Sequence, residues 1–536
     1  MNRREFLKIL GFTSLVSAMK PFECSVFGSS RHRPNVLLIL CDDMGYSDLG
    51  CFGSDIHTPN LDALAANGLR MTQFYNAARC CPTRASLLTG LYPHQAGVGS
   101  MVKNLGTPEY QGYLNDQCMT LAEVLKAAGY KTYMSGKWHV GENKGHWPLD
   151  RGFDRYWGLI NGASNYYNDI YYRDPSRRLT FLLDDQPFEV PHTTEEMWKR
   201  NEGYYITDAI TDYAIKFLKE HQNSEKPFFL YLAYNAPHWP LHAFPEDIDK
   251  YRGKYDCGWD ELRKRRYQKQ LQLGLFDESV KLSPRDPNVP AWEDASEKEK
   301  EEFKLEMALY AAVIDRMDRN IGRVIDQLKK MGVFEDTLIM FLSDNGGCHT
   351  TPEFPHLKGT PGGPNSFPCY GYPGANVSNT PFRKYKQFIH EGGISTPFIA
   401  HYPKIIKPNR IDDQPAHVID IMPTLIDLCQ AEYPEMRKGK KLKPLKGISL
   451  RPVFEGKKIK RKDPLYWEHV GNRGVRIGDW KLVAAKPDLK WELHNIKEDR
   501  AELVDLSEKY PEKKKELLAT YEKWAKQNHV LPWKGK

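Results

Sequence analysis

The sequence predicts an α/β protein whose mixed, mostly parallel sheet is flanked by helices. Four apolar runs of strand length each end in a burst of polar residues, and helical patterns lie between the runs. Continuous apolar runs are typical of strands buried on both faces, and alternation of strand with helix is typical of a parallel sheet. The four runs are residues 35–40, 130–134, 228–232 and 337–342.

The helical segments are recognised by periodicity and by their ends. Residues 120–129 begin with a capping box of Thr120 and Glu123 and finish at a glycine. Three further segments have helical periodicity, residues 205–222, 297–331 and 418–430. Residues 351–395 are rich in Gly, Pro and Asn, which predicts an irregular region beside the sheet.

The pattern changes near residue 456. Short strand-like runs separated by turns follow, and an amphipathic helix lies within residues 506–529. We therefore predict a large domain at residues 31–455 and a small C-terminal α+β domain with an antiparallel sheet at residues 456–536.

The N-terminus predicts export. Arg3 and Arg4 precede Phe-Leu-Lys and a short apolar run at residues 9–18, a pattern that resembles a bacterial twin-arginine signal. The run is too short for a membrane span, although an uncleaved anchor is the alternative. We assign residues 1–30 to a signal and linker, and predict a periplasmic or extracellular protein without a stable membrane span.

Composition excludes several classes of protein. The 536 residues are 40% hydrophobic and 27% charged, as in ordinary globular proteins. The net charge of +7 is mild and predicts no nucleic-acid partner. Basic clusters at residues 437–443 and 457–462 are typical of solvated loops, or else attract a polyanionic substrate. Ten cysteines form no disulfide framework or zinc spacing in so long a chain, and any pairing among them stays open.

Polar residues after the first and last apolar runs suggest a metal site. Asp42 and Asp43 follow the first run, and Asp344 and Asn345 follow the last. The carboxyl ends of parallel strands meet at one edge of a sheet, where ligands collect. Carboxylate and amide oxygens suit calcium or magnesium, although each pair alone is also typical of a turn.

Residues 80–90 carry the most specific motif in the chain. They read Cys-Cys-Pro-Thr-Arg-Ala-Ser-Leu-Leu-Thr-Gly, which resembles the Cys-x-Pro-(Ser/Thr)-Arg signature of the type I sulfatases. A buried cysteine pair in a loop is the alternative. The resemblance implies an alkaline-phosphatase-like fold, oxidation of Cys80 to formylglycine by a maturation enzyme, and one divalent ion per chain. That ion is calcium, with magnesium second, held by Asp42, Asp43, Asp344, Asn345 and the modified Cys80.

Further elements of the sequence extend this resemblance. Residues 136–141 resemble the family's Gly-Lys-Trp-His-Leu-Gly element, and residues 235–238 match its Ala-Pro-His element. The implied catalytic residues are Cys80, Arg84, Lys137, His139, His238 and Lys386. The spelling around residue 386 departs from the family's commoner form, so Lys384 is the competing assignment.

The resemblance implies a sulfuric ester hydrolase. A formylglycine hydrate attacks sulfur, His238 or Lys386 protonates the leaving alcohol, and His139 removes the proton that lets sulfate depart. We predict aryl sulfates as surrogates and sulfated glycans as natural substrates. Pocket-forming residues are expected at 161–172 and 469–473. The competing hypotheses are a phosphoester or phosphonate hydrolase of the same fold, and a non-catalytic protein that binds sulfated glycans.

Overall fold

The four predicted strands are neighbours in one sheet. A computed structural model describes residues 33–533, and in it β1 (Asn35–Cys41) lies between β8 (Phe228–Ala233) and β9 (Thr337–Ser343). β4 (Lys131–Gly136) pairs with the far side of β8, and all these pairings are parallel. The sequence prediction of a mostly parallel sheet is confirmed.

Shorter strands extend this sheet to ten members in the order β11-β2-β10-β9-β1-β8-β4-β5-β6-β7. β10 and the β6–β7 edge run antiparallel to their neighbours, which makes the sheet mixed. The shorter strands are β2 Leu69–Met71, β5 Arg155–Leu159, β6 Phe181–Leu183, β7 Gln186–Pro187, β10 Phe398–His401 and β11 Arg410–Asp412. Two-stranded pairs are formed by β3 Phe74–Tyr75 with β12 Ala416–His417 and by β13 Met436–Arg437 with β14 Lys440–Lys441.

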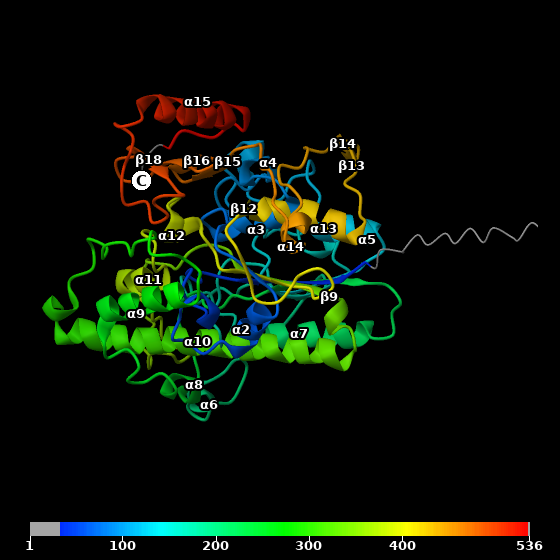
Figure 1. The fold of residues 1–536 in the computed structure, drawn as a ribbon. Coiled ribbons are helices and arrows are strands. Elements are labelled where there is room, and N and C mark those ends of the chain that lie inside the picture. Colours follow the sequence, from blue (N-terminus) through cyan, green and yellow to red (C-terminus); the bar gives the residue numbers. More distant parts are fainter. Residues whose placement is uncertain (1–32, 534–536) are drawn as a thin grey trace, which may run out of the picture. The chain divides into compact units, whose positions relative to one another are not determined.

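Helices cover both faces of the sheet. Successive side chains of β1 point to opposite faces, so they are buried in two different cores. Leu37 and Ile39 pack into one core with α2 (Pro59–Ala66), α7 (Ile206–His221) and α10 (Glu297–Lys330). Val36, Leu38 and Leu40 pack into a second core on the other face, with α3 (Cys80–Thr89), α5 (Leu121–Ala127) and α13 (Ile421–Cys429). The two helical layers lie on opposite sides of β9 in Figure 1.

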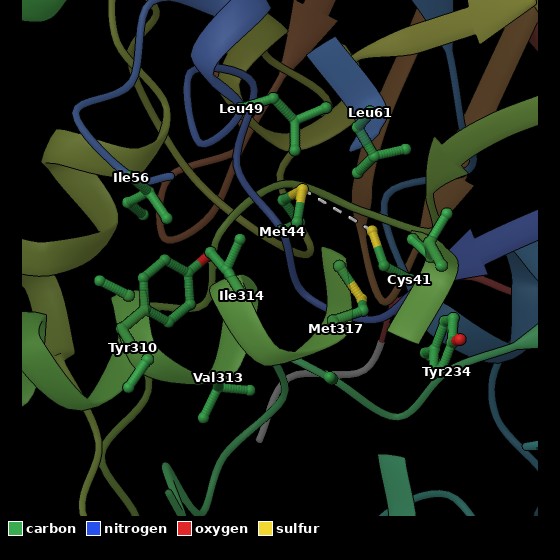
Figure 2. Packing of buried hydrophobic residues seen from close by; sticks show 14 of the residues in the cluster. Cys41, Met44, Leu49, Ile56, Leu61, Tyr234, Tyr310, Val313, Ile314 and Met317 are labelled. Carbon is green, nitrogen blue, oxygen red and sulfur yellow. Dashed lines mark hydrogen bonds between the residues drawn. The ribbon is translucent and has the colours of Figure 1, made fainter. Parts of the chain in front are cut away.

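The loop after β1 is fixed in the first core. Figure 2 shows Met44 and Leu49 of this loop among Tyr310, Ile314 and Met317 of α10. The hydroxyl of Tyr310 donates a 2.7 Å hydrogen bond to Asp48 Oδ2 within the same loop. Buried side chains therefore anchor the loop that carries Asp42 and Asp43.

A four-stranded antiparallel sheet, β15-β16-β17-β18, follows near the C-terminus. Its strands are β15 Leu465–His469, β16 Asn472–Ile477, β17 Trp480–Ala484 and β18 Trp491–Asn495. Helix α15 (Pro511–Gln527) packs on this sheet through Leu517, Tyr521 and Trp524. The predicted antiparallel sheet and closing helix are present, whereas the domain boundary at residue 456 stays a prediction.

Some elements differ from the sequence predictions. α9 (Gly258–Gln272) was not predicted because its sequence, rich in Arg, Lys and Gln, lacks a wide apolar stripe. The segment expected to be irregular contains α11 (Gly371–Ser378) and α12 (Glu391–Ile394). The helix expected at residues 418–430 begins as a 3-10 turn, and α13 starts at Ile421.

The remaining helices are short. They are α4 Pro93–Ala96, α6 Glu195–Lys199, α8 Pro245–Asp249 and α14 Arg451–Phe454. Cys41, Cys51, Cys118, Cys257, Cys348 and Cys369 are free thiols. No helix within residues 33–533 is both long and apolar enough to cross a membrane. The predicted export signal at residues 1–30 lies outside the described residues.

Candidate active site

The metal-ligand candidates meet where β1 and β9 end. The register pairs Cys41 with Ser343, so the residues that follow each strand lie side by side. The backbone N–H of Asp43 donates to Asp344 Oδ1 at 3.3 Å, and Asn345 Nδ2 donates to Asp43 Oδ1 at 2.7 Å. All four candidates, including Asp42, are buried. Sheet topology thus brings together residues that are 301 and 302 positions apart in the sequence.

Three oxygens of this cluster have no hydrogen-bond partner within the described chain. They are Asp42 Oδ1, Asp43 Oδ2 and Asn345 Oδ1, all of them buried. Ligand atoms of Asp42, Asp43 and His238 lie within 4.8 Å of one another. Unpartnered buried oxygens are costly, and carboxylate and amide oxygens are the ligands of hard divalent cations. These residues therefore fit a calcium or magnesium ion.

Three basic side chains face the three carboxylates. Arg84 donates to Asp344 Oδ2 from Nε at 3.1 Å and from Nη2 at 2.8 Å. Lys137 donates to Asp42 Oδ2, and Lys386 Nζ lies 2.5 Å from Asp43 Oδ1. The charges of the side chains alone therefore cancel, and a bound divalent cation would leave the site positive.

The pKa values of the acids reflect this balance. Burial would raise the pKa of Asp42, but Lys137, His238 and Arg84 lower it to about 2. Burial and the charge of Asp42 raise the pKa of Asp344, although Arg84 opposes them. A cation beside these carboxylates would favour their ionised forms.

Cys80 is the first residue of α3. Arg79 before it is extended, and the helix begins when the Thr83 N–H donates to the Arg79 carbonyl at 2.9 Å. The Thr83 hydroxyl accepts from the Ala77 N–H at 2.9 Å, which fixes the approach to the helix. Cys80 thus lies at a helix N-terminus, where the backbone dipole favours an anion. A hydrogen bond with Cys81 lowers the thiol pKa of Cys80, against the effect of burial, and Lys137 lowers it further.

His139 lies against the motif at the end of β4. Its Nε2 is 3.2 Å from Cys81 Sγ, and its backbone has a φ of 55°. A Cβ at Gly162 would stand 2.4 Å from Nε2, so only glycine leaves room for this ring. Burial lowers the pKa of His139, which keeps the ring neutral near pH 7.

His238 follows β8 and faces the carboxylates. Its Nδ1 lies 2.6 Å from the Trp239 carbonyl oxygen, so Nδ1 carries the donated proton. Its Nε2 lies 3.4 Å from Asp43 Oδ2. Nε2 is therefore the atom that can gain or lose a proton in the site, and burial lowers the pKa of this histidine.

The structure separates the two lysine candidates. The Lys386 side chain is buried against Asp43, whereas the Lys384 ammonium lies over the Phe388 ring, 5.2 Å from its centroid. Of these two candidates, Lys386 is therefore the one that reaches a carboxylate of the site.

Several non-glycine residues around this site have positive φ, a costly conformation that is typical of functional sites. They are Asp43, Ala78, His139 and Gln387, with φ of 70°, 62°, 55° and 82°.

A cavity of about 640 Å³ opens onto these side chains. Cys80, His139, His238 and Lys386 all line it. So do Asn161–Ala163 and Tyr171–Tyr172, as predicted for residues 161–172. Residues 469–473, also predicted to form the pocket, do not line this cavity, and Gly471 and Arg473 line a separate one. Asn472 is buried and donates from Nδ2 to the carbonyl of Gln387, which does line the cavity.

Sequence reasoning missed four arginines in the cavity wall. They are Arg79, Arg173, Arg177 and Arg178. Arg79 directly precedes the motif, and the other three lie just beyond the predicted segment in the run Tyr-Tyr-Arg-Asp-Pro-Ser-Arg-Arg. The sequence does contain a signal for the last three of these arginines, because they follow two tyrosines within a run of eight residues.

The comparisons with known proteins decide the family. A family model described as Sulfatase matches residues 34–431. The chain belongs to the sulfatase family. A second model, N-sulphoglucosamine sulphohydrolase, C-terminal, matches residues 382–527. The resemblance to type I sulfatases that residues 80–90 indicated is confirmed.

Relatives and solved structures agree with this assignment. A sulfatase of Schizosaccharomyces pombe, described as uncharacterized, is 38% identical over 91% of this sulfatase and 92% of its own length. The arylsulfatase of Klebsiella aerogenes is 34% identical over 82% of this chain and 95% of its own length. The crystal structure of Ps i-CgsB in complex with k-i-k-neocarrahexaose is 27% identical, with a TM-score of 0.69 over 92% of this chain and 93% of that one. The chain is a sulfatase enzyme of alkaline-phosphatase-like fold.

Proposed function

We propose that this sulfatase hydrolyses sulfate monoesters by means of formylglycine at position 80 and one calcium ion held by Asp42, Asp43, Asp344 and Asn345. The observation that carries the proposal is the group of three buried oxygens that have no hydrogen-bond partner among residues 33–533, in a site where Arg84, Lys137 and Lys386 balance the acids. Cys80 contributes to the electrostatics of both Asp42 and Asp344, which supports a position beside them.

The modified residue and the ion would supply the nucleophilic oxygen and the positive charge that activates it. The remaining steps belong to side chains of this chain. Lys386, which lines the cavity, is the cation that meets the negative charge on the sulfate oxygens, while Lys137 and Arg84 hold Asp42 and Asp344 in place. His238, with Nδ1 tied to the Trp239 carbonyl, is oriented to hold at Nε2 the proton that the leaving alcohol takes. His139, neutral at pH 7, is the base that accepts a proton at position 80.

We propose sulfated glycans as the natural substrates. The cavity combines aromatic side chains, such as Tyr172 and Trp239, with amide and guanidinium groups, a mixture suited to sugar rings with charged substituents. An N-acetylglucosamine-6-O-sulfatase of Bacteroides thetaiotaomicron is 27% identical over 98% of this chain and 91% of its own length. The structure of Ps i-CgsB bound to k-i-k-neocarrahexaose also supports an oligosaccharide ligand.

Turnover of two aryl esters tests the reaction. We expect kcat/KM for 4-nitrophenyl sulfate to exceed that for 4-nitrophenyl phosphate. Faster phosphate hydrolysis would favour a phosphoester or phosphonate hydrolase instead. A chelator should abolish sulfate release, and calcium should restore it more fully than magnesium.

The mass of the peptide that contains Cys80 tests the modification. Conversion of the thiol to the aldehyde lowers the peptide mass by about 18 Da. An unmodified peptide in protein that was produced with its maturation enzyme would favour a non-catalytic protein that binds sulfated glycans.

The proposed location is the periplasm or the outside of the cell. Replacement of Arg3 and Arg4 by lysine should leave the protein in the cytoplasmic fraction, because a twin-arginine signal depends on both arginines. Unchanged export of that variant would contradict the proposal.

A further inference from the structure

Three of the arginines that sequence reasoning missed belong to one ordered loop. Residues 169–179 form a hairpin, which we call the arginine hairpin. The Tyr171 N–H donates to the Arg177 carbonyl at 3.1 Å, and the Leu179 N–H donates to the Asp169 carbonyl at 2.8 Å. An antiparallel bridge joins Ile170 to Arg178 between these two bonds. This backbone pairing holds the arginines on a defined turn, so their approach to the cavity is fixed.

Arg173 and Arg177 stack on the aromatic residues of the same hairpin. The Arg173 guanidinium lies 5.6 Å from the Tyr172 ring centroid, and that of Arg177 lies 5.3 Å from the Tyr171 ring centroid. Neither forms an ion pair with an acid in the part of the chain that the structure describes. Arg178 has one loose pair, 3.5 Å from Asp169. Stacking orients a guanidinium and leaves its N–H edge free to bind an oxyanion.

The cavity wall is therefore strongly basic. Its charged side chains are Arg79, Arg173, Arg177, Arg178, Lys386 and a single acid, Glu142, besides the titratable Cys80 and two histidines. The carboxylates of Asp42, Asp43 and Asp344 are already matched by Arg84, Lys137 and Lys386. The arginine hairpin has three arginines and two acids, Asp169 and Asp174, neither of which lines the cavity. It therefore adds net positive charge that neither the acids of the site nor the one reacting sulfate neutralises.

We propose that the arginine hairpin is a second anion-binding site, so that the substrate carries an additional oxyanion besides the ester that is cleaved. Resting on the proposed sulfatase function, this inference narrows the substrate class to saccharides with at least two anionic groups. The planar fork of arginine fits a sulfate and a carboxylate equally well, so the second group is a further sulfate or a uronate.

Calorimetric binding to the Cys80→Ser protein, which needs no turnover, tests this inference. The probes are glucosamine, galactosamine and galactose, each with one sulfate, with two sulfates, or with one sulfate and a linked uronic acid. We expect at least one doubly anionic probe to bind about tenfold more tightly than its monosulfated counterpart. Preference for the disulfated or for the uronate form identifies the second group.

Arginine variants test whether the preference for doubly anionic probes arises from the arginine hairpin. In the Cys80→Ser background, Arg173→Gln with Arg177→Gln should reduce the tenfold preference to less than twofold. Arg252→Gln is the matched control, since Arg252 is 61% exposed, pairs with Asp249 and is absent from the cavity wall. Equal binding of singly and doubly anionic probes, or a preference that survives the double variant, would overturn the inference.

Turnover by the unsubstituted enzyme distinguishes failure of the second anion-binding site from failure of the proposed sulfatase function. If the matured enzyme does not hydrolyse 4-nitrophenyl sulfate, the hydrolase mechanism is refuted. The preference of the Cys80→Ser protein for doubly anionic probes is a separate measurement and would still support the second anion-binding site. Normal turnover with no preference among the probes would refute the second site alone.

Discussion

The ammonium group of Lys386 lies beside Asp43, a candidate metal ligand. Replacement of Lys386 tests whether this side chain binds the sulfate group. Lys386→Ala removes the ammonium beside Asp43 Oδ1, so we expect kcat/KM for 4-nitrophenyl sulfate to fall by about 10²–10³-fold. Lys384→Ala is the control, because Lys384 contacts the Phe388 ring and should change kcat/KM by less than about threefold. Comparable losses in both variants would mean that the site does not distinguish the two lysines.

Gly162 tests the position of His139. In Gly162→Ala the new methyl group would lie 2.4 Å from His139 Nε2, so the ring must move. A misplacement of about 1 Å can cost about 10²-fold in rate, and we expect a fall in kcat of that size. Thermal unfolding controls for damage to the fold. Addition of Gly162→Ala to His139→Ala should lower kcat no further, whereas additive losses would show that the glycine acts elsewhere.

The residue types of the site and the part of the cavity wall within residues 161–172 were predictable, but the arginines of the wall were not. Cys80, Arg84, Asp42 and Asp344 stand in short local patterns whose chemistry is specific. Arg173 and Arg177 reach the same cavity only because a hairpin folds over it. The run of two tyrosines and three arginines is visible in the sequence, but its place over the cavity depends on loop conformation.

Among the elements, the start of β17 connects the C-terminal sheet to the rest of the molecule through buried charge. Lys481 Nζ lies 2.7 Å from Glu391 Oε1 of α12 and 2.8 Å from Glu502 Oε1, and all three side chains are fully buried. Removal of one partner from a buried pair leaves an uncompensated charge. This cluster should therefore contribute to the stability of both sheets.

Lys481→Met tests that role. We expect the free energy of unfolding to fall by about 3–5 kcal/mol, because buried Glu502 loses its ion-pair partner and Glu391 keeps only Arg500 among the described residues. Urea denaturation measures the change. Lys490→Met is the control, since Lys490 is 67% exposed, 4.0 Å from Asp505, and should have almost no effect. Similar losses in both variants would contradict the importance of burial.

Strand and helix patterns were predictable where they were strong. β1, β4, β8 and β9 appear as apolar runs because both of their faces are covered. α9 and α11 were missed because one is highly polar and the other begins with Gly-Tyr-Pro-Gly, a sequence more typical of a turn. Packing against α10 and against each other stabilises both helices despite these weak local signals.

At the scale of the whole molecule, one core joins the two predicted domains. Tyr75, Ile389 and Ile419 pack in the same cluster as Trp467 and Val475 of the C-terminal sheet. Residues from Pro34 onward accordingly form one compact unit. The change of sequence pattern near residue 456 marks a second sheet, and composition alone cannot reveal that its core is shared.

Buried neutral histidines make the stability of this unit depend on pH. His242 accepts from the Tyr166 N–H at Nδ1 and lies 2.9 Å from the Ser366 carbonyl through Nε2, which requires the neutral ring. Burial lowers its pKa to about 4. Between this value and the ordinary histidine pKa of about 6.5, the unfolded chain binds the proton more strongly, so stability is lost as the pH falls.

His242→Gln measures that linkage. Between pH 7 and pH 5 the loss in free energy of unfolding should be about 2 kcal/mol smaller in the variant than in the unsubstituted protein, because one proton is no longer linked to unfolding. Urea denaturation at both pH values provides the comparison. Identical pH dependence of the two proteins would show that His242 is already protonated, or equally accessible, in the fold.

A crystal structure of the matured enzyme grown with calcium and a sulfated ligand tests the central claim most directly. We predict formylglycine at position 80 and one ion, with oxygens of Asp42, Asp43, Asp344 and Asn345 at about 2.3–2.6 Å from it. The ligand sulfate should lie between that ion and Lys386. An ion bound elsewhere, or a sulfate bound away from position 80, would contradict the account.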